Sequence, residues 1–224
     1  MTTFDKLDKT TPKYLQLQLL AKTNYDNTED EYYEVTSRTP NFYWYNAINQ
    51  NMLPAARGTL ASTLGTVSHA LVEILATKRS ANVGTLLSNG TLPVQAEVAF
   101  AVMRHLKHIH FDVIQRDISV PVTNTVFGVQ LYGDLFLRDS DGTNVVCEIK
   151  TSWQPATTSA PVESETGRTH REQAIMGALG MGDGWGALGV VVEINPVEII
   201  RSIRVKSIYY SPETVQRLSA TLEM

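Results

Sequence analysis

The feature that most constrains the fold is an alternating pattern in residues 144–152. Within it, Cys147 and Ile149 alternate with Glu148 and Lys150. Because successive side chains of a β-strand point to opposite faces, the acid and the lysine share one face and the apolar residues share the other. The pattern predicts a strand whose apolar face packs on a core and whose other face presents a carboxylate and an amine.

This strand is expected to form one arm of a β-hairpin. The turn signal Asp139–Gly142 separates it from a second apolar stretch, residues 126–138, which contains Gly133 and Asp134. Hairpin pairing brings Asp134 toward Glu148, and two carboxylates a few ångströms apart cannot both stay ionised without a counter-charge. Hard divalent cations such as Mg²⁺ or Mn²⁺ bind carboxylates, water and phosphate oxygens. With a nearby lysine to hold or activate a water, the pair indicates a metal-dependent phosphodiesterase.

Four motifs, in the order histidine, aspartate, acid-x-lysine and glutamine, resemble those of the PD-(D/E)xK nuclease superfamily, in particular its RecB-like exonuclease branch. Residues 65–69 (GTVSH) look like the G-x-x-x-H motif, and Asp134 followed by Glu148–Lys150 looks like the two acidic motifs. Gln173 looks like the first residue of the Q-x-x-x-Y motif, in which Gly177 replaces the tyrosine. Only the glutamine of that motif carries over.

The resemblance covers about residues 60–195 and implies an α/β fold with a mixed central β-sheet flanked by helices, a restriction-endonuclease-like core. It also implies a nuclease that uses Mg²⁺ or Mn²⁺. The implied metal ligands are three side chains and one backbone carbonyl: His69, Asp134, Glu148 and Ile149. Lys150 is implied to orient the attacking water, and Gln173 to position the substrate strand.

His69 lies in a predicted amphipathic helix, residues 59–78. The apolar residues of this helix recur at 3.6-residue spacing, and His69 falls about 180° from the centre of their stripe, on the same side as Glu73. Two interpretations follow. The polar face is turned toward a catalytic cleft, as the resemblance implies, or it is solvated. An imidazole ligand shifts the metal preference toward Mn²⁺.

The chain is expected to divide into an N-terminal extension, residues 1–55, and a nuclease domain, residues 56–224. The extension contains a predicted short helix at 13–21, an acidic run at 26–34 and an aromatic cluster at 42–45. These aromatic side chains either pack the extension onto the domain or stack on unpaired bases.

The rest of the chain shows further helix and strand patterns. They predict helices at 94–110, 169–181 and from Pro212 onward, the last capped by Ser211, and strands at 112–122, 126–138, 144–152, 187–194 and 200–210. Asp117, on the first of these strands, is a weaker candidate ligand than Asp134. We expect a solvated helix end for His105 and His108, and a surface or helix-start position for Glu97.

Composition excludes several classes of protein. The 224-residue chain has one cysteine, Cys147, which excludes a disulfide framework and a multi-cysteine metal or iron–sulfur site. It shows no membrane span and no signal peptide at its start, so an intracellular protein without a membrane partner is expected. A net charge of −4 argues against a large basic footprint, and binding to nucleic acid should be modest and salt-sensitive.

The favoured function is therefore a DNA nuclease, an exonuclease acting on ends or single strands in replication, recombination or repair. Viruses and phages also encode compact nucleases of this kind. Three alternatives stay open. The site also resembles that of cap-snatching RNA endonucleases of segmented negative-strand RNA viruses. The fold could serve as a binding or assembly module with an idle site. Glu148 and Lys150 could also form an ordinary ion pair on a solvent-facing sheet.

Overall fold

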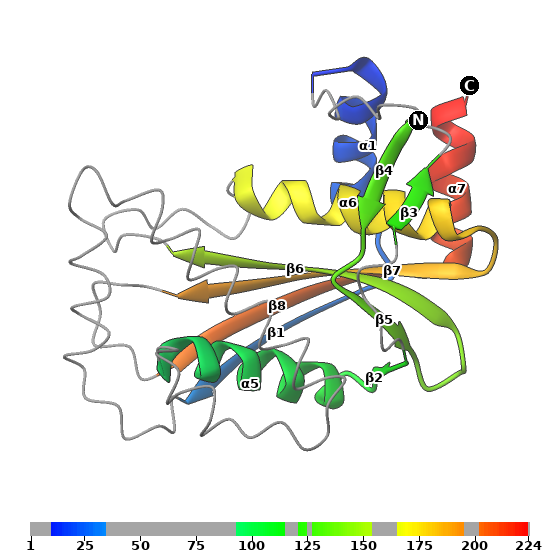
Figure 1. Ribbon diagram of the computed structural model, residues 1–224. Helices are drawn as coiled ribbons and strands as arrows, with labels where there is room; N and C mark the ends of the chain where they lie inside the picture. The colour runs from blue at the N-terminus through cyan, green and yellow to red at the C-terminus, as the bar shows by residue number, and fades with distance from the viewer. Residues whose placement is uncertain are drawn as a thin grey trace.

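The described part of the chain is an α/β fold in which a curled, mixed β-sheet is flanked by helices (Figure 1). The computed structural model describes residues 10–34, 93–114, 121–124, 127–153, 165–194 and 202–223. His69 with its predicted helix, Asp117 and the aromatic cluster at 42–45 lie outside these residues, as does the expected domain boundary. The predicted fold class is confirmed at the level of a mixed sheet with flanking helices.

The main sheet contains six of the described strands. The described helices are α1 (Pro12–Thr23), α5 (Pro93–His108), α6 (Glu165–Met181) and α7 (Pro212–Glu223). The described strands are β1 (Asn27–Glu34), β2 (Asp112–Val113), β3 (Pro121–Asn124), β4 (Val129–Tyr132), β5 (Leu135–Arg138), β6 (Asn144–Trp153), β7 (Trp185–Ile194) and β8 (Ser202–Tyr210). The main sheet has the order β1-β8-β7-β6-β5-β2, and β3 pairs with β4 in a separate sheet. The pair β6–β7 is parallel, and the other described pairs are antiparallel.

Both faces of the main sheet are packed. Val145 and Cys147 of β6 join the core beneath α5, while Val146 joins a second core with residues of α1, α6 and α7, which lie on the other side of the sheet (Figure 1). The predicted alternation along β6 is therefore confirmed. Glu148 shares the face of Val146 and is only 8% exposed. An ordinary ion pair on a solvent-facing sheet requires Glu148 to be exposed, so its burial argues against that interpretation, although Lys150 itself is exposed.

Helix α1 confirms the short helix predicted near the N-terminus and makes it part of the core. The Thr11 hydroxyl accepts a hydrogen bond from the Tyr14 N–H at 3.4 Å, and Pro12 occupies the first turn, as is typical of a helix start. Tyr14, Leu17 and Ala21 have no exposed surface and pack in the core shared with α6 and α7. This part of the expected extension is thus built into the same core as the rest of the sheet.

The acidic run that sequence analysis placed in the extension forms strand β1. It pairs antiparallel with β8 along its whole length. Two cations of β8 match its charges, since Asp30 accepts hydrogen bonds from Arg204 at 2.7 and 2.9 Å and lies 3.4 Å from the Lys206 ammonium. The acidic strand β1 is stabilised in the sheet because its neighbour β8 supplies the opposite charge.

Two of the predicted strands are each split between two sheets, which corrects the expected boundaries. Within 112–122, β2 pairs with β5 and β3 pairs with β4. Within 126–138, the chain leaves the small sheet at Gly133 and enters the main sheet at Leu135. A Cβ atom at Gly133 would lie 3.1 Å from the Phe136 ring and 3.3 Å from Val146. The absence of a side chain lets the backbone pass this close to the core and change sheets.

The β5–β6 hairpin, by contrast, follows the prediction. Its turn is closed by Asp139, whose carboxylate accepts hydrogen bonds from the Asp141 and Thr143 N–H groups at 3.0 and 2.8 Å. Gly142 has a positive φ of 87°, which glycine adopts without strain. The predicted cap of α7 is also confirmed, because the Ser211 hydroxyl accepts a hydrogen bond from the Thr214 N–H at 3.2 Å.

Two polar residues of α5 are buried, contrary to the expectation of a solvated helix end and a surface acid. Glu97 is 5% exposed and His105 is fully buried. The His105 ring nitrogens lie 2.8 Å from the Ser207 hydroxyl and 3.3 Å from that of Tyr33, because α5 crosses the sheet where polar side chains of β8 and β1 face it. His108 does remain exposed, at 60% of its side chain, and contacts Glu31 at 2.5 Å. No helix in the described part of the chain is long and apolar enough to cross a membrane.

The buried His105 predicts a loss of stability in acid. Burial lowers the pKa of His105, and the nearby Glu31 opposes this more weakly. Because the folded pKa lies below the unfolded value of about 6.5, the neutral ring supports the fold above that pH, and this support is lost as the pH falls through the folded pKa. We expect the free energy of unfolding to fall more steeply for the parent than for His105→Gln as the pH falls below about 6.5. Urea titrations at several pH values measure it, and parallel pH profiles would contradict it.

Candidate active site

Asp134 and Glu148 lie at the same level of the β5–β6 hairpin. Leu135 opposes Cys147 in the antiparallel register, so Asp134, the residue before β5, falls opposite Glu148. Opposed residues of an antiparallel pair project from the same face, with Cβ atoms about 4.5–5.5 Å apart. The hairpin therefore brings together the two carboxylates that sequence analysis selected.

A backbone hydrogen bond fixes Asp134 in this position. Its Oδ2 atom accepts from the Ile149 N–H at 2.7 Å. In a β-strand the N–H and C=O of one residue point to the same side, so the Ile149 carbonyl also projects toward the edge where Asp134 lies. That orientation agrees with the role that the resemblance implies for this carbonyl, next to the two acids.

Glu148 is held in an environment that disfavours its charge. Burial raises the pKa of Glu148 well above its usual range, and the negative charge of Asp134 and hydrogen bonding to it raise it further. The positive charge of Lys150 acts in the opposite direction but does not offset these effects. Without a cation, the carboxyl group of Glu148 therefore favours its protonated form, and a cation placed between the two acids would favour the ionised form.

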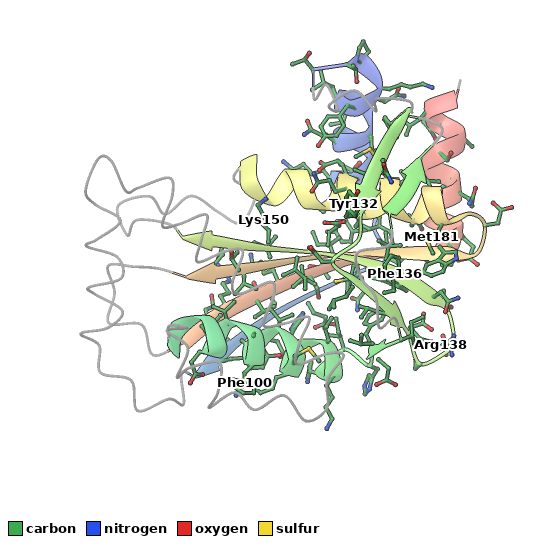
Figure 2. All side chains as sticks on the ribbon, in the orientation of Figure 1. Phe100, Tyr132, Phe136, Arg138, Lys150 and Met181 are labelled. Carbon is green, nitrogen blue, oxygen red and sulfur yellow. The ribbon has the colours of Figure 1, made fainter. Side chains whose placement is uncertain are left out.

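Lys150 lies on the face of Glu148 but reaches solvent. Alternation along β6 places both side chains on the α6 side of the sheet, and Figure 2 shows Lys150 pointing from β6 toward the first turns of α6. Its side chain is exposed, although its charge acts on Glu148. The site therefore has a buried acid at its base and an ammonium group at its open side.

Helix α6 covers this face and carries Gln173. It returns the chain from the end of β6 to the start of β7, so it runs antiparallel to β6. Gly177 lies against Val146, and Gln173, one turn earlier, lies toward Glu148 and Lys150 and is half-buried. Gln173 therefore lies at the middle of α6, nearer than Gly177 to the C-terminal half of β6.

Close packing against Val146 explains why position 177 is a glycine. A Cβ atom there would lie 2.9 Å from Cγ1 of Val146, closer than side-chain carbons approach. Helix α6 packs so tightly on β6 that no larger residue fits. The departure from the Q-x-x-x-Y pattern is therefore a consequence of close helix–sheet packing at this point.

We expect Gly177→Ala to destabilise the fold despite the higher helix propensity of alanine. Overpacking of this kind costs about 1–3 kcal/mol, which exceeds the gain of up to about 1 kcal/mol from replacing a helical glycine. Urea unfolding measures the loss. Adding Val146→Ala removes the obstructing methyl groups, so the double variant should lose less than the sum of the single losses. Additive losses would show that the two residues do not clash.

Two buried charged residues of α6 were not selected from the sequence. Arg171 packs over Gly189, its Cγ atom lying 3.4 Å from where a Cβ would be, and Glu172 is 1% exposed. Gly189 is the β7 partner of Glu148, so Arg171 lies over the strand position next to that acid. Burial raises the pKa of Tyr210; the charge of Arg171 opposes this increase and the charge of Glu172 adds to it. Their helical spacing with the buried residues Ala174 and Ile175 was the signal that could have indicated burial.

The single cysteine, Cys147, is fully buried in the α5 core, on the face of β6 opposite Glu148. Burial raises the pKa of the Cys147 thiol well above its usual range, with further contributions from Asp134 and Glu148. We therefore expect no reaction with a thiol reagent in the native protein and full reaction in denaturant, because only the thiolate attacks. A spectrophotometric thiol assay with and without urea measures this, and fast labelling of the native protein would contradict the buried position.

The described residues supply part of the implied metal site. They contain no group of three or more histidine, cysteine, aspartate or glutamate side chains arranged to hold a metal ion. Asp134 and Glu148 form a pair, and the implied third side chain, His69, lies outside the described residues. The weaker candidate Asp117 also lies outside them.

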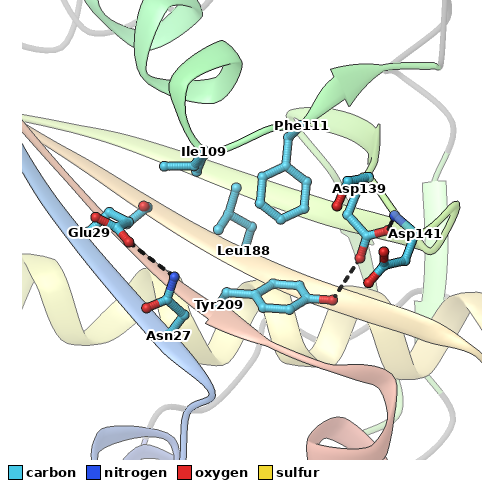
Figure 3. Close-up of a pocket in the computed structure, with 10 residues that line it drawn as sticks. Asn27, Glu29, Ile109, Phe111, Asp139, Asp141, Leu188 and Tyr209 are labelled. Atoms are coloured by element: carbon cyan, nitrogen blue, oxygen red, sulfur yellow. Dashed lines mark hydrogen bonds between the residues drawn. The ribbon is translucent and has the colours of Figure 1, made fainter.

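A separate pocket opens on the α5 side of the sheet (Figure 3). Its lining includes the apolar residues Phe111 and Leu188 and the acids Glu29, Asp139 and Asp141. Tyr209 also lines it and donates a hydrogen bond to Asp139 at 3.2 Å. The pocket contains none of the residues selected from the sequence, and its acidic lining does not suit a phosphate.

No model of a known protein family matches the chain, and no curated protein matches it.

Proposed function

We propose that the chain is a divalent-metal-dependent nuclease, with a restriction-endonuclease-like core, that hydrolyses phosphodiester bonds in DNA. The observation that carries the proposal is the apposition of Asp134 with the buried Glu148. Two adjacent acids, of which Glu148 is buried and Asp134 is half-buried, are costly unless a cation or a proton neutralises them. Lys150 on the same face and Gln173 above it add the groups that phosphodiester hydrolysis requires.

The donor set fits a hard cation such as Mg²⁺ or Mn²⁺. Asp134 and Glu148 supply carboxylate oxygens, the Ile149 carbonyl points to the same edge, and His69 would complete the set. When bound, such a cation lowers the pKa of a water molecule and offsets negative charge on the phosphate.

The chain's own residues then have distinct tasks. The hydrogen bond from the Ile149 N–H holds Asp134 in register, so the two carboxylates are positioned before substrate binds. The Lys150 ammonium is free to reach solvent, where it orients the attacking water or stabilises charge on the phosphate. Gln173, which is half-buried, positions the substrate strand by a hydrogen bond.

End-labelled single-stranded DNA, double-stranded DNA and RNA, each with Mn²⁺, Mg²⁺ or EDTA, test the proposal. We expect metal-dependent cleavage of DNA that is lost in Lys150→Ala and retained in Lys107→Ala, which removes an exposed lysine from α5 far from the acids. The product ladder separates exonuclease from endonuclease action.

The same assay separates the remaining alternatives. Cleavage of RNA alone would favour the RNA endonuclease. Absence of cleavage with intact metal binding would favour the idle binding module, and absence of both would overturn the proposal.

A further inference from the structure

Tyr132 is an exposed aromatic residue directly beside the candidate site. It is the last residue of β4 and is 59% exposed. Its neighbour Leu131 packs into the core on the α6 side, so alternation turns the tyrosine ring away from that core. The ring of Tyr132 therefore presents much of its surface to solvent, where a base could stack on it.

The chain geometry places this ring close to the acids. Tyr132 precedes Asp134 by two positions, and two residues span at most about 7 Å. Between these two residues the backbone passes from the small sheet to the main sheet. Gly133 therefore connects the end of β4 directly to Asp134. Figure 2 shows Tyr132 and Lys150 on the same, α6 side of the main sheet. Because so little backbone separates Tyr132 from Asp134, a strand whose phosphate lies at the acids passes close to the end of β4.

The negative net charge of the chain favours a mode of nucleic-acid binding that depends little on charge. The chain has a net charge of −4, and the site is built around two acids. Affinity for nucleic acid cannot rest on neutralising many phosphates, which requires a basic surface. Stacking of bases on aromatic side chains supplies affinity that depends little on charge, and it requires unpaired bases.

We propose that Tyr132 is a stacking platform for an unpaired base, and that the substrate of the site is single-stranded nucleic acid. This inference rests on the proposed nuclease function and specifies its substrate. The ring holds the base while Gln173 and Lys150 contact the adjacent backbone. Duplexes bind weakly because their bases are not available to the ring.

Fluorescence anisotropy with labelled oligo(dT) of about 20 nucleotides and with a duplex of equal length tests the inference, using Ca²⁺ to permit binding without cleavage. We expect Tyr132→Ala to weaken single-strand binding roughly tenfold, with little change for the duplex. Tyr132→Phe keeps the ring and should bind as the parent does. Tyr32→Ala is the matched control, since Tyr32 is 65% exposed on β1, at the other edge of the main sheet.

The outcomes separate this inference from the function on which it rests. If the parent cleaves DNA but Tyr132→Ala binds single strands as tightly as the parent, the stacking platform is overturned and the nuclease stands. If Tyr132→Ala loses binding but the parent cleaves nothing, the nuclease is overturned and the platform is supported. Equal losses in Tyr132→Ala and Tyr32→Ala would overturn the platform, because a specific site distinguishes them.

Discussion

Glu148→Gln is expected to abolish cleavage and to raise the melting temperature of the metal-free protein at neutral pH. The substitution keeps the shape and hydrogen-bonding capacity of the side chain but removes its charge. A missing metal carboxylate costs several kcal/mol of transition-state stabilisation, which lowers the rate roughly a thousandfold or more. The stability gain follows because burial and Asp134 both disfavour the ionised form of Glu148. Cleavage assays and thermal unfolding in EDTA measure the two effects.

The sign of the stability effect depends on pH. Because the folded pKa of Glu148 is raised above its unfolded value of about 4.3, its contribution to stability is fully present below that pH and is lost as the pH rises through the folded pKa. Parent and Glu148→Gln should therefore diverge as the pH rises. Glu193→Gln is the control for activity, because this acid of β7 contacts Arg204 instead. Unchanged cleavage in Glu148→Gln would contradict the site.

Mn²⁺ is expected to raise the melting temperature of the parent protein. A ligand that binds only the folded state at a hundred times its dissociation constant adds about 2.7 kcal/mol, or roughly 5–10 °C for a chain of this size. Asp134→Asn and Glu148→Gln should each lose most of this increase. The metal relieves the repulsion between the two acids, so both must be present for the full effect.

Thermal unfolding with Mn²⁺, with Mg²⁺ and with EDTA measures the shift. The control variant is Asp183→Asn, which removes an exposed acid at the turn before β7, where it accepts a hydrogen bond from Gln216. It should keep the full Mn²⁺ increase. An equal increase in all four proteins would mean that the cation binds elsewhere.

Local patterns were sufficient to predict the centre of the candidate site. The alternation around Glu148 predicts a strand, the turn at Asp139–Gly142 predicts a hairpin, and these two facts place Asp134 opposite the acid. Helix α6 and the Ser211 cap follow from equally local signals. These features depend on residues that are close together in the chain, so the pattern of a single sequence is sufficient to predict them.

Features set by distant contacts could not be predicted in this way. The acidic strand β1 is stabilised by cations of β8, far along the chain. His105 is buried because α5 crosses β8 at Ser207, and Gly177 is required by a methyl group of Val146. Each depends on which elements become neighbours, and periodicity within one element does not contain that information.

The pairing of β1 with β8 has a consequence for synthesis of the protein. Asp30 and Arg204 are 174 positions apart, and at about 5–20 residues per second the ribosome needs roughly 9–35 s to make the intervening chain. During that time β1 has no partner, and an apolar strand in this state would pair with other nascent chains. The acids of β1 segments on different nascent chains repel one another. This repulsion disfavours pairing between chains until β8, with its cations, has been synthesised. The same charges that match β8 in the finished sheet act earlier as protection against aggregation.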